Sequence, residues 1–327
     1  MKETLKQRCE LFIQNRDIIK SEFGWQSTYM YPLCANIYTS KNQTVNVDQM
    51  NYCKSILKEK TGVFSNFRGT SQMATITILA MSHNPEQQME RMLELYSKLK
   101  EYFSTSTYLT VSAAMLVDLI QPNQYDKVVN RTRDIYDLMK QAHRFLTSSE
   151  DSTFAALLAV SNLEEEYIAE EMEKCYQILK GHFNSRNAVQ SLSHVLTLGE
   201  GLAEDKCNKV IEIFDYLYEH GYKYGKNYEL ATLGVLAMLD VDTEILCQEI
   251  MEVDDFLKEQ KGFGAFSVGS KQRLMYAALL AMNEYIPSKE IWQATTLNSV
   301  ISIVIAQQVA ICASIAATSA AAASASS

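Results

Sequence analysis

The sequence predicts an all-α protein built from about six or seven repeated α-hairpins. Three observations lead to this prediction. Only 4 prolines and 12 glycines occur in 327 residues. These low counts argue against a β-rich fold and against long loops. Leu, Met, Glu, Lys, Gln and Ala dominate, and these are good helix formers. A short motif also returns along the chain at a nearly constant spacing, which indicates an internal repeat.

The repeat is carried by the last turn of one helix in each hairpin. A Leu or Met marks this turn, followed four to seven residues later by an aromatic residue, and the steps between markers are 42, 40, 40, 38 and 40 residues. We expect each marker to be buried and each aromatic to close the turn onto the next helix. The markers are Leu57, Leu99, Met139, Leu179, Leu217 and Leu257, and the aromatics are Phe64, Phe103, Phe145, Phe183, Tyr222 and Phe263.

The two helices of each hairpin differ in pattern. The helix that ends at the marker is amphipathic: Ile168, Met172, Cys175 and Leu179, for example, form one apolar stripe opposite charged residues. Its partner is apolar on nearly all sides and rich in Ala, as in "FAALLAV" at 154 and "YAALLAM" at 276, so we expect it to be buried.

An extra helix over roughly 3–23 precedes the hairpins, which begin at "STYMYPLCANIY" from residue 27. Six pairs follow, and then a seventh apolar helix near 267–283. Asn84-Pro85 predicts a helix N-terminus, with Pro at the first helical position. Glycines 62, 181, 221 and 262 stand where helices end, as C-terminal glycines often do. Such hairpins form either an open α-solenoid or a closed α/α toroid, and the apolar helices slightly favour the toroid.

The domain prediction is a single helical-repeat domain over 1–290 and an apolar Ala/Ser-rich segment over 291–327. No charged residue follows Glu290. We expect roughly 295–318 to be a helix buried against the hairpins or in a self-association interface, because an apolar helix without a polar face must be covered. Gln307 and Gln308 in its middle make it a poor membrane span. Membrane association through this tail is therefore the less favoured alternative.

Charge and cysteine usage limit the partners and the compartment. The net charge is −9 and the sequence pI about 5.2, so nothing supports a nucleic-acid role. The 7 cysteines are odd in number, widely spaced and without a Cys-x-x-Cys pair, which favours a reducing, cytoplasmic compartment. We predict no cofactor and no metal site. A protein or a small apolar ligand, and a homo-oligomer, remain open as partners.

"FLKEQKGFGAFSVGSKQRLMYAALLAM" at 256–282 is similar to the repeat of terpenoid cyclases and prenyltransferase β subunits. That resemblance implies an α/α toroid enzyme with an apolar or isoprenoid-like substrate. Over its whole length, the chain resembles an uncharacterised all-helical bacterial family of unknown function, number 4003, with a similar length and a similar Ala/Ile tail. This second resemblance implies no activity and no site residues.

Two groups of residues are weak candidates for a ligand site. "LDVDT" at 239–243 resembles the Asp-x-Asp-Asp acid motif of class II terpene cyclases, but Asp240 and Asp242 lie at the wrong end of the apolar helix, and an N-cap role for Asp242 or Thr243 explains them better. His143, His182 and His220 share a repeat position. Equivalent positions in adjacent hairpins should be about 10 Å apart, too far to share one zinc ion, so we interpret the histidines as helix C-terminal residues.

The function predicted from these observations is binding. A strong repeat without a catalytic motif indicates a cytoplasmic interaction scaffold that uses a concave face or a central cavity. The alternative is the toroid enzyme implied by 256–282.

Overall fold

The computed structural model describes residues 1–24, 28–69, 71–227, 229–264 and 267–285. These residues form α-helices and two short 3₁₀ turns, and no strand occurs among them. The helices are α1 Glu3–Glu22, α2 Met30–Ser40, α3 Val47–Lys60, α4 Gln72–Ala80, α5 Pro85–Leu99, α6 Thr107–Leu119, α7 Tyr125–Ala142, α8 Asp151–Ala159, α9 Glu165–Leu179, α10 Arg186–Thr197, α11 Ala203–Glu219, α12 Leu230–Ala237, α13 Thr243–Lys258 and α14 Ser270–Met282. The 3₁₀ turns are η1 Asn66–Arg68 and η2 Pro122–Gln124. The all-α prediction is confirmed, while the predicted tail helix lies outside the described residues.

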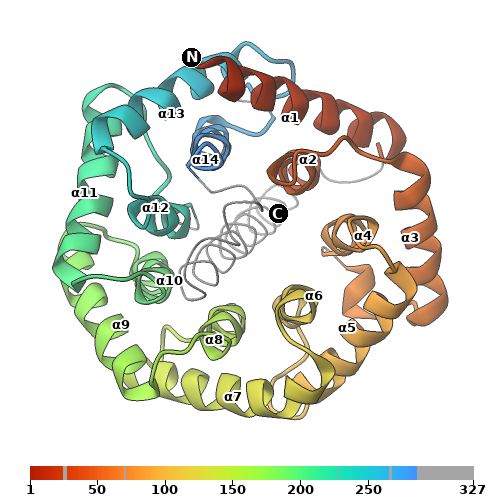
Figure 1. The fold of residues 1–327 in the computed structure, drawn as a ribbon. Helices are drawn as coiled ribbons and strands as arrows, with labels where there is room; N and C mark the ends of the chain where they lie inside the picture. Colours follow the sequence, from red (N-terminus) through yellow and green to blue (C-terminus); the bar gives the residue numbers. More distant parts are fainter. Residues whose placement is uncertain (25–27, 70, 228, 265–266, 286–327) are drawn as a thin grey trace, which may run out of the picture. The chain divides into compact units, whose positions relative to one another are not determined.

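The chain separates into two compact units. Unit 1 comprises Met1–Gln14 and the described residues from Glu166 onwards, and unit 2 comprises Asn15–Glu165. In unit 2 the even-numbered helices α2, α4, α6 and α8 contact one another in series, and α3, α5 and α7 pack in a second series beside them (Figure 1). In unit 1, α10, α12 and α14 form the even-numbered series, and α11 packs against α13.

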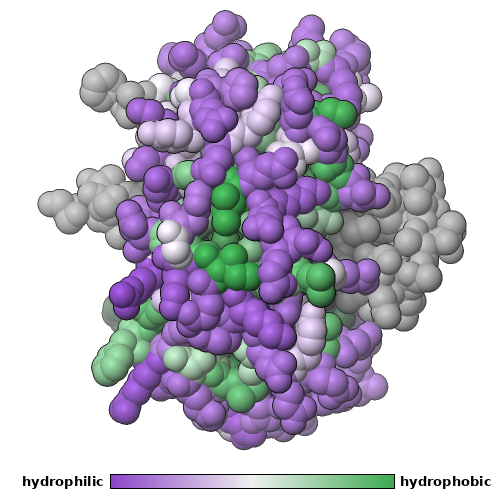
Figure 2. Space-filling view, turned by 90° about the vertical axis from the view of Figure 1, so that its left-hand side faces the viewer, coloured by the Kyte–Doolittle hydropathy of each residue, from purple (hydrophilic) through white to green (hydrophobic). Residues whose placement is uncertain are grey.

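The division into buried and amphipathic helices agrees with the sequence pattern. Every residue of α2 from Met30 to Thr39 is buried, and so is every residue of α8. The odd-numbered helices bury one stripe, and all six marker residues in their last turns are almost completely buried. The face that α9 and α11 turn to solvent is predominantly hydrophilic, with hydrophobic side chains in separate groups (Figure 2). Burial of the marker positions therefore accounts for the repeat in the sequence.

The first residues of α1 pack within unit 1 against helices that lie more than 230 residues later. The Phe12 ring centroid lies 5.8 Å from those of Phe263 and Tyr276. Thr4 Oγ1 donates to Glu284 Oε2 at 2.6 Å, and Arg8 forms an ion pair with the same carboxylate. The first turns of the predicted extra helix, up to Gln14, are thus part of the core of this unit.

The aromatic residues that follow the markers do not all behave as predicted. Phe183 and Phe263 are 2% and 0% exposed, but Phe64 and Phe145 are 101% and 97% exposed, so the prediction is wrong for these two. After α3, the turn η1 buries Phe67 in place of Phe64, with its ring 5.1 Å from that of Tyr96.

After α7, the His143 carbonyl accepts hydrogen bonds from the amides of Leu146 and Thr147. This turn half-buries Leu146 while Phe145 is exposed.

The prediction that glycines end the helices holds in part. Gly221 and Gly262 adopt φ of 89° and 96° after α11 and α13, whereas Gly62 and Gly181 have no positive φ.

In three hairpins, a cationic side chain of the odd-numbered helix holds the end of an even-numbered helix. Arg91 of α5 donates to carbonyls at the end of α6 at 2.7 and 2.8 Å, and Lys209 of α11 donates to those after α12 at 2.5 and 3.1 Å. Arg131 of α7 does the same after α8. Helix C-terminal carbonyls lack intrahelical partners and carry partial negative charge. The equivalent residues of α9 and α13 are Glu171 and Glu249, which instead bind lysines: Lys206 of α11 and Lys2, which precedes α1.

Candidate functional site

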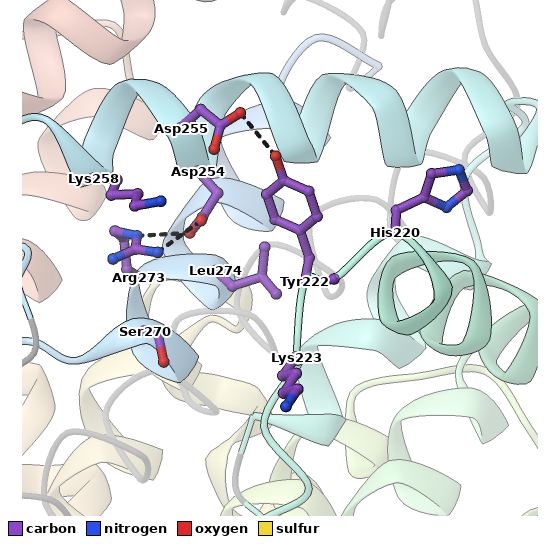
Figure 3. Close-up of a pocket in the computed structure, with 10 residues that line it drawn as sticks. His220, Tyr222, Lys223, Asp254, Asp255, Lys258, Ser270, Arg273 and Leu274 are labelled. Carbon is purple, nitrogen blue, oxygen red and sulfur yellow. Dashed lines mark hydrogen bonds and ion pairs between the residues drawn. The ribbon is translucent and has the colours of Figure 1, made fainter.

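A cleft of about 360 Å³ opens in unit 1 where α11, α13 and α14 present their ends (Figure 3). The connection after α11 forms one wall, the last turn of α13 forms another, and the first turn of α14 lies opposite. Cleft residues therefore come from three segments that the repeat brings to one end of the hairpins. The lining residues are His220, Gly221, Tyr222, Lys223, Asp254, Asp255, Lys258, Ser270, Arg273 and Leu274.

A buried ion pair forms the base of this cleft. Arg273 Nε donates to Asp254 Oδ1 at 2.9 Å and Nη2 donates to Oδ2 at 2.8 Å, so the pair is bidentate. Arg273 Nη1 also donates to the Phe263 carbonyl at 3.2 Å. Both side chains are buried. Bidentate pairs fix the plane of the guanidinium, so α13 and α14 are held in register below the cleft.

Tyr222 and Asp255 form a second pair at the rim. Tyr222 Oη donates to Asp255 Oδ2 at 2.8 Å (Figure 3). Burial, followed by the hydrogen bond to Asp255 and its negative charge, raises the pKa of Tyr222 to about 12. The hydroxyl therefore stays protonated near neutral pH and acts as a hydrogen-bond donor.

The remaining charges of the cleft are cationic. Lys223 and Lys258 are exposed side chains of the lining, and neither has a carboxylate within ion-pair distance among the described residues. Asp254 is neutralised by Arg273, and Asp255 faces the tyrosine. The lining thus carries three Lys or Arg against two Asp. The first turn of α14, beginning at Ser270, adds the positive end of a helix dipole.

This arrangement suits recognition of an anionic group better than acid–base chemistry. Ser270 is the only serine of the lining, and the lining holds a single histidine, His220. The His220 ring points away from Arg273 and Asp254 (Figure 3), and its Nδ1 lies 2.8 Å from the Tyr216 carbonyl oxygen. Lysine side chains and a helix N-terminus are instead groups that bind carboxylates and phosphates in proteins.

A second cleft, of about 340 Å³, lies in unit 2 and is lined by Lys127, Arg131 and the 161–165 segment. Its arginine is occupied with the carbonyl oxygens of that segment and with Glu165, 3.8 Å from Arg131 Nε. The cationic group here therefore holds the end of α8, and this cleft is the weaker candidate.

The sequence model of the family described as "Protein of unknown function (DUF4003)" matches residues 15–310. The chain belongs to the DUF4003 family. The resemblance to this family predicted from the sequence is confirmed. Among relatives of this DUF4003 protein is the "Uncharacterized protein YeaA" of Bacillus subtilis (strain 168), which is 23% identical over 323 residues, 95% of this chain and 94% of that protein. No solved structure matches the chain.

The two aspartates singled out in the sequence lie outside the cleft of the DUF4003 chain. Asp242 is the N-cap of α13, and its Oδ1 accepts a hydrogen bond from the Ile245 amide at 3.1 Å. Asp240 is exposed in the turn before it. The capping interpretation of Asp242 is confirmed, and the acid-motif comparison finds no further support here.

The three histidines lie at or just beyond helix C-termini, as interpreted from the sequence. His143 and His220 are the C-cap residues of α7 and α11. His182 follows α9, and its Nε2 lies 3.1 Å from Asp215 Oδ1 of α11. No group of three His, Cys, Asp or Glu side chains placed to hold a metal ion occurs among the described residues. Of the predicted candidates, only His220 reaches the cleft.

Sequence reasoning missed Lys223, Lys258 and Arg273. Lys258 directly follows the marker Leu257, and Tyr222 is itself one of the predicted aromatics. The repeat therefore contained a usable signal for one wall of the cleft. Arg273 could have been noticed as a charged residue inside an otherwise apolar helix, where burial demands a partner.

None of the helices in the described part of the DUF4003 chain has the length and hydropathy required to cross a membrane.

Proposed function

We propose that this protein is a binding protein in which a scaffold of helical hairpins presents the unit 1 cleft to a small molecule with a carboxylate or phosphate group. The observation that carries the proposal is the pairing pattern of the cleft. Arg273 and Asp254 neutralise each other at its base, while Lys223 and Lys258 line its open part. The sequence left open a small apolar ligand, and we propose an anionic ligand in its place.

The hairpin scaffold supports a binding role because it positions loops on a rigid base. The cleft residues lie at helix ends and in one connection, whereas the helices beneath them are held by buried markers such as Leu217 and Leu257. Binding residues are commonly located on loops held by a rigid scaffold.

We retain the α-solenoid or α/α toroid of about 40-residue repeats as part of this proposal. Small-angle X-ray scattering would test this arrangement through the dimensions of the particle.

The alternative, an α/α toroid enzyme acting on an isoprenoid-like substrate, gains no specific observation. Its sequence basis was the resemblance of 256–282 to a toroid repeat. The separate acid-like motif lends it nothing, because the Asp242 carboxylate is used as a helix cap. The cleft is lined mainly by charged and polar side chains, which are poorly suited to an apolar chain. We therefore prefer the binding role.

A thermal-shift screen tests this function. The whole chain would be heated with a panel of small carboxylates and phosphates, in parallel with the variant Lys258→Glu. We expect at least one compound to raise the Tm of the wild type by several degrees and to have little effect on the variant, because ligand binding stabilises only the folded state. Lys180→Glu is the matched control, since Lys180 follows the marker of α9 as Lys258 follows that of α13. Equal shifts in all three proteins would refute the proposed site.

A further inference from the structure

Unit 2 carries an unusual surface at one end of its hairpins. The connections after α3, α5 and α7 each expose an aromatic residue: Phe64 and Phe145 are almost fully exposed, and Tyr102 is 44% exposed. Val63 beside Phe64 is exposed as well. Single exposed apolar residues are ordinary on protein surfaces, but Phe64 and Phe145 follow the markers of two repeats at nearly the same spacing. Tyr102 precedes the repeat aromatic Phe103, and its hydroxyl donates to Asn130 Oδ1 of α7 at 3.0 Å. In unit 1 the equivalent residues after α9 and α13, Phe183 and Phe263, are buried.

These aromatics lie at the same end of unit 2. Each hairpin runs through an odd-numbered helix and back through the next even-numbered one, and α3 packs on α5 and α5 on α7. Each C-terminal connection leads into the start of the next even-numbered helix, and α4, α6 and α8 contact one another in series. We therefore infer that the three connections lie on one face of unit 2. In chain order, the connection that carries Tyr102 lies between those that carry Phe64 and Phe145. We call this surface, made of residues 57–69, 97–106 and 139–149, the aromatic end.

The aromatic end is basic, although the chain as a whole is acidic. Its three segments contain seven Lys or Arg and two Glu, a net charge of +5, whereas the whole chain has −9. Exposed lysines directly follow the buried markers of all three helices, at Lys58, Lys100 and Lys140, and Arg144 precedes Phe145. Two further lysines of these segments form ion pairs with residues of the neighbouring helix, at 2.6 Å each. The aromatic and the cation thus occur together in each repeat.

We propose that the aromatic end docks onto an anionic lipid surface. Aromatic side chains that project singly from loops can enter the headgroup region of a bilayer, while flanking lysines are attracted to anionic headgroups. The protruding Phe64 and Phe145 side chains stand on separate loops, which suits a broad, deformable surface better than a groove-binding peptide. The positive charge of this end, against the negative charge of the chain, orients the protein so that these loops face the lipid.

Vesicle flotation of the full-length chain tests the proposal. Vesicles of phosphatidylcholine with about one third phosphatidylglycerol are compared with vesicles of phosphatidylcholine alone. We expect binding to the anionic vesicles, at least about fivefold weaker for each lysine reversed and largely lost at 0.5 M salt. Phe64→Ser and Phe145→Ser should each weaken binding about fivefold or more and leave the Tm unchanged, because both side chains are exposed.

Two control variants separate this surface from general effects. Leu202→Ser removes an exposed apolar residue of a unit 1 connection, and Lys127→Glu reverses a charge near the start of α7, about 20 Å from Lys140 on the same helix. Both control variants should bind vesicles as tightly as the wild type does, whereas Lys140→Glu should bind them more weakly. Equal binding to both vesicle types, or phenylalanine variants that bind like the wild type, would overturn the proposal. Self-association that Phe64→Ser abolishes, without vesicle binding, would instead assign the surface to a second copy.

Discussion

Lys206 Nζ lies 2.7 Å from Glu171 Oε1, and these side chains of α11 and α9 are only 5% and 6% exposed. The same ammonium donates to the Gly199 carbonyl at 2.9 Å, just beyond the end of α10. In the neighbouring hairpins a single Arg or Lys holds the helix end, whereas here a lysine from the next odd-numbered helix does so and Glu171 occupies the equivalent position. The repeat thus preserves the cationic contact to the helix end while its source changes.

The buried pair should show strong coupling. Lys206→Met leaves the Glu171 carboxylate without its counter-charge, so we expect a loss of about 3–5 kcal/mol in the free energy of unfolding of this region. The double variant Lys206→Met/Glu171→Leu should lose much less than the sum of the single variants, because no buried charge then lacks a partner. Urea unfolding followed by circular dichroism measures all four proteins of the cycle. Additive losses would show that the two charges act independently.

Arg131 should stabilise unit 2 through backbone carbonyls more than through its ion pair. Its guanidinium donates to carbonyl oxygens of Ala159, Ser161 and Leu163, and Glu165 is 3.8 Å away. We expect Arg131→Met to lower the free energy of unfolding by about 1–3 kcal/mol, because it leaves helix-end carbonyls without a donor. Glu165→Gln should cost under about 1 kcal/mol, as for other partly exposed ion pairs. Chemical unfolding of both variants tests this order, and a larger loss for Glu165→Gln would reverse it.

The aromatics after the markers should differ sharply in their contribution to stability. Phe263 packs on Phe12 in the core of unit 1, so Phe263→Ala should cost about 3–5 kcal/mol. Phe64→Ala should stay within about 0.5 kcal/mol of the wild type, because its side chain is exposed. Thermal unfolding of the two variants compares equivalent repeat positions directly. A similar drop in Tm for both would contradict the exposure of Phe64.

Glu150 and Asp151 at the start of α8 should make stability depend on pH. Burial and the neighbouring Asp151 raise the pKa of Glu150 to about 7, and burial raises that of Asp151 to about 6. The folded state therefore favours the protonated carboxyls. This stabilisation is complete below their ordinary pKa values near 4 and is lost as the pH rises through 6 and 7.

Glu150→Gln removes the part of this dependence that comes from Glu150 and leaves the part that comes from Asp151. We expect the variant to raise the free energy of unfolding by about 1–3 kcal/mol at pH 8 and to have little effect at pH 4. The exposed Glu166→Gln serves as the control. Unfolding midpoints measured between pH 4 and pH 8 test the sign, and a wild type that becomes more stable over this interval would contradict it.

The sequence was sufficient for the helical pattern because burial repeats at fixed spacing. Leu57 and Leu257 are 200 residues apart, yet both are fully buried in the last turn of an odd-numbered helix. Phe64 shows where this reasoning fails, since the path of a connection depends on local turns such as η1, which the periodicity does not encode. The domain prediction for 1–290 and 291–327 remains a prediction, and the tail lies outside the described residues.

The candidate site was less predictable because its residues come from three segments. Arg273 and Asp254 are 19 residues apart and meet only when α13 and α14 pack. Asp242 shows the reverse case: a local spacing that resembled a catalytic motif is explained by a cap on the following helix. Local motifs therefore indicated helix ends correctly, while the cleft required tertiary structure.

The anion-binding cleft is tested most directly by calorimetric titration of the whole chain with inorganic phosphate and with citrate at low ionic strength. We predict saturable, one-to-one binding of at least one of these anions. Lys258→Glu and Lys223→Glu should each weaken it at least tenfold, and Lys180→Glu should leave it unchanged. No saturable heat with either anion, or equal affinity in the wild type and Lys258→Glu, would contradict the assignment of this cleft as the binding site.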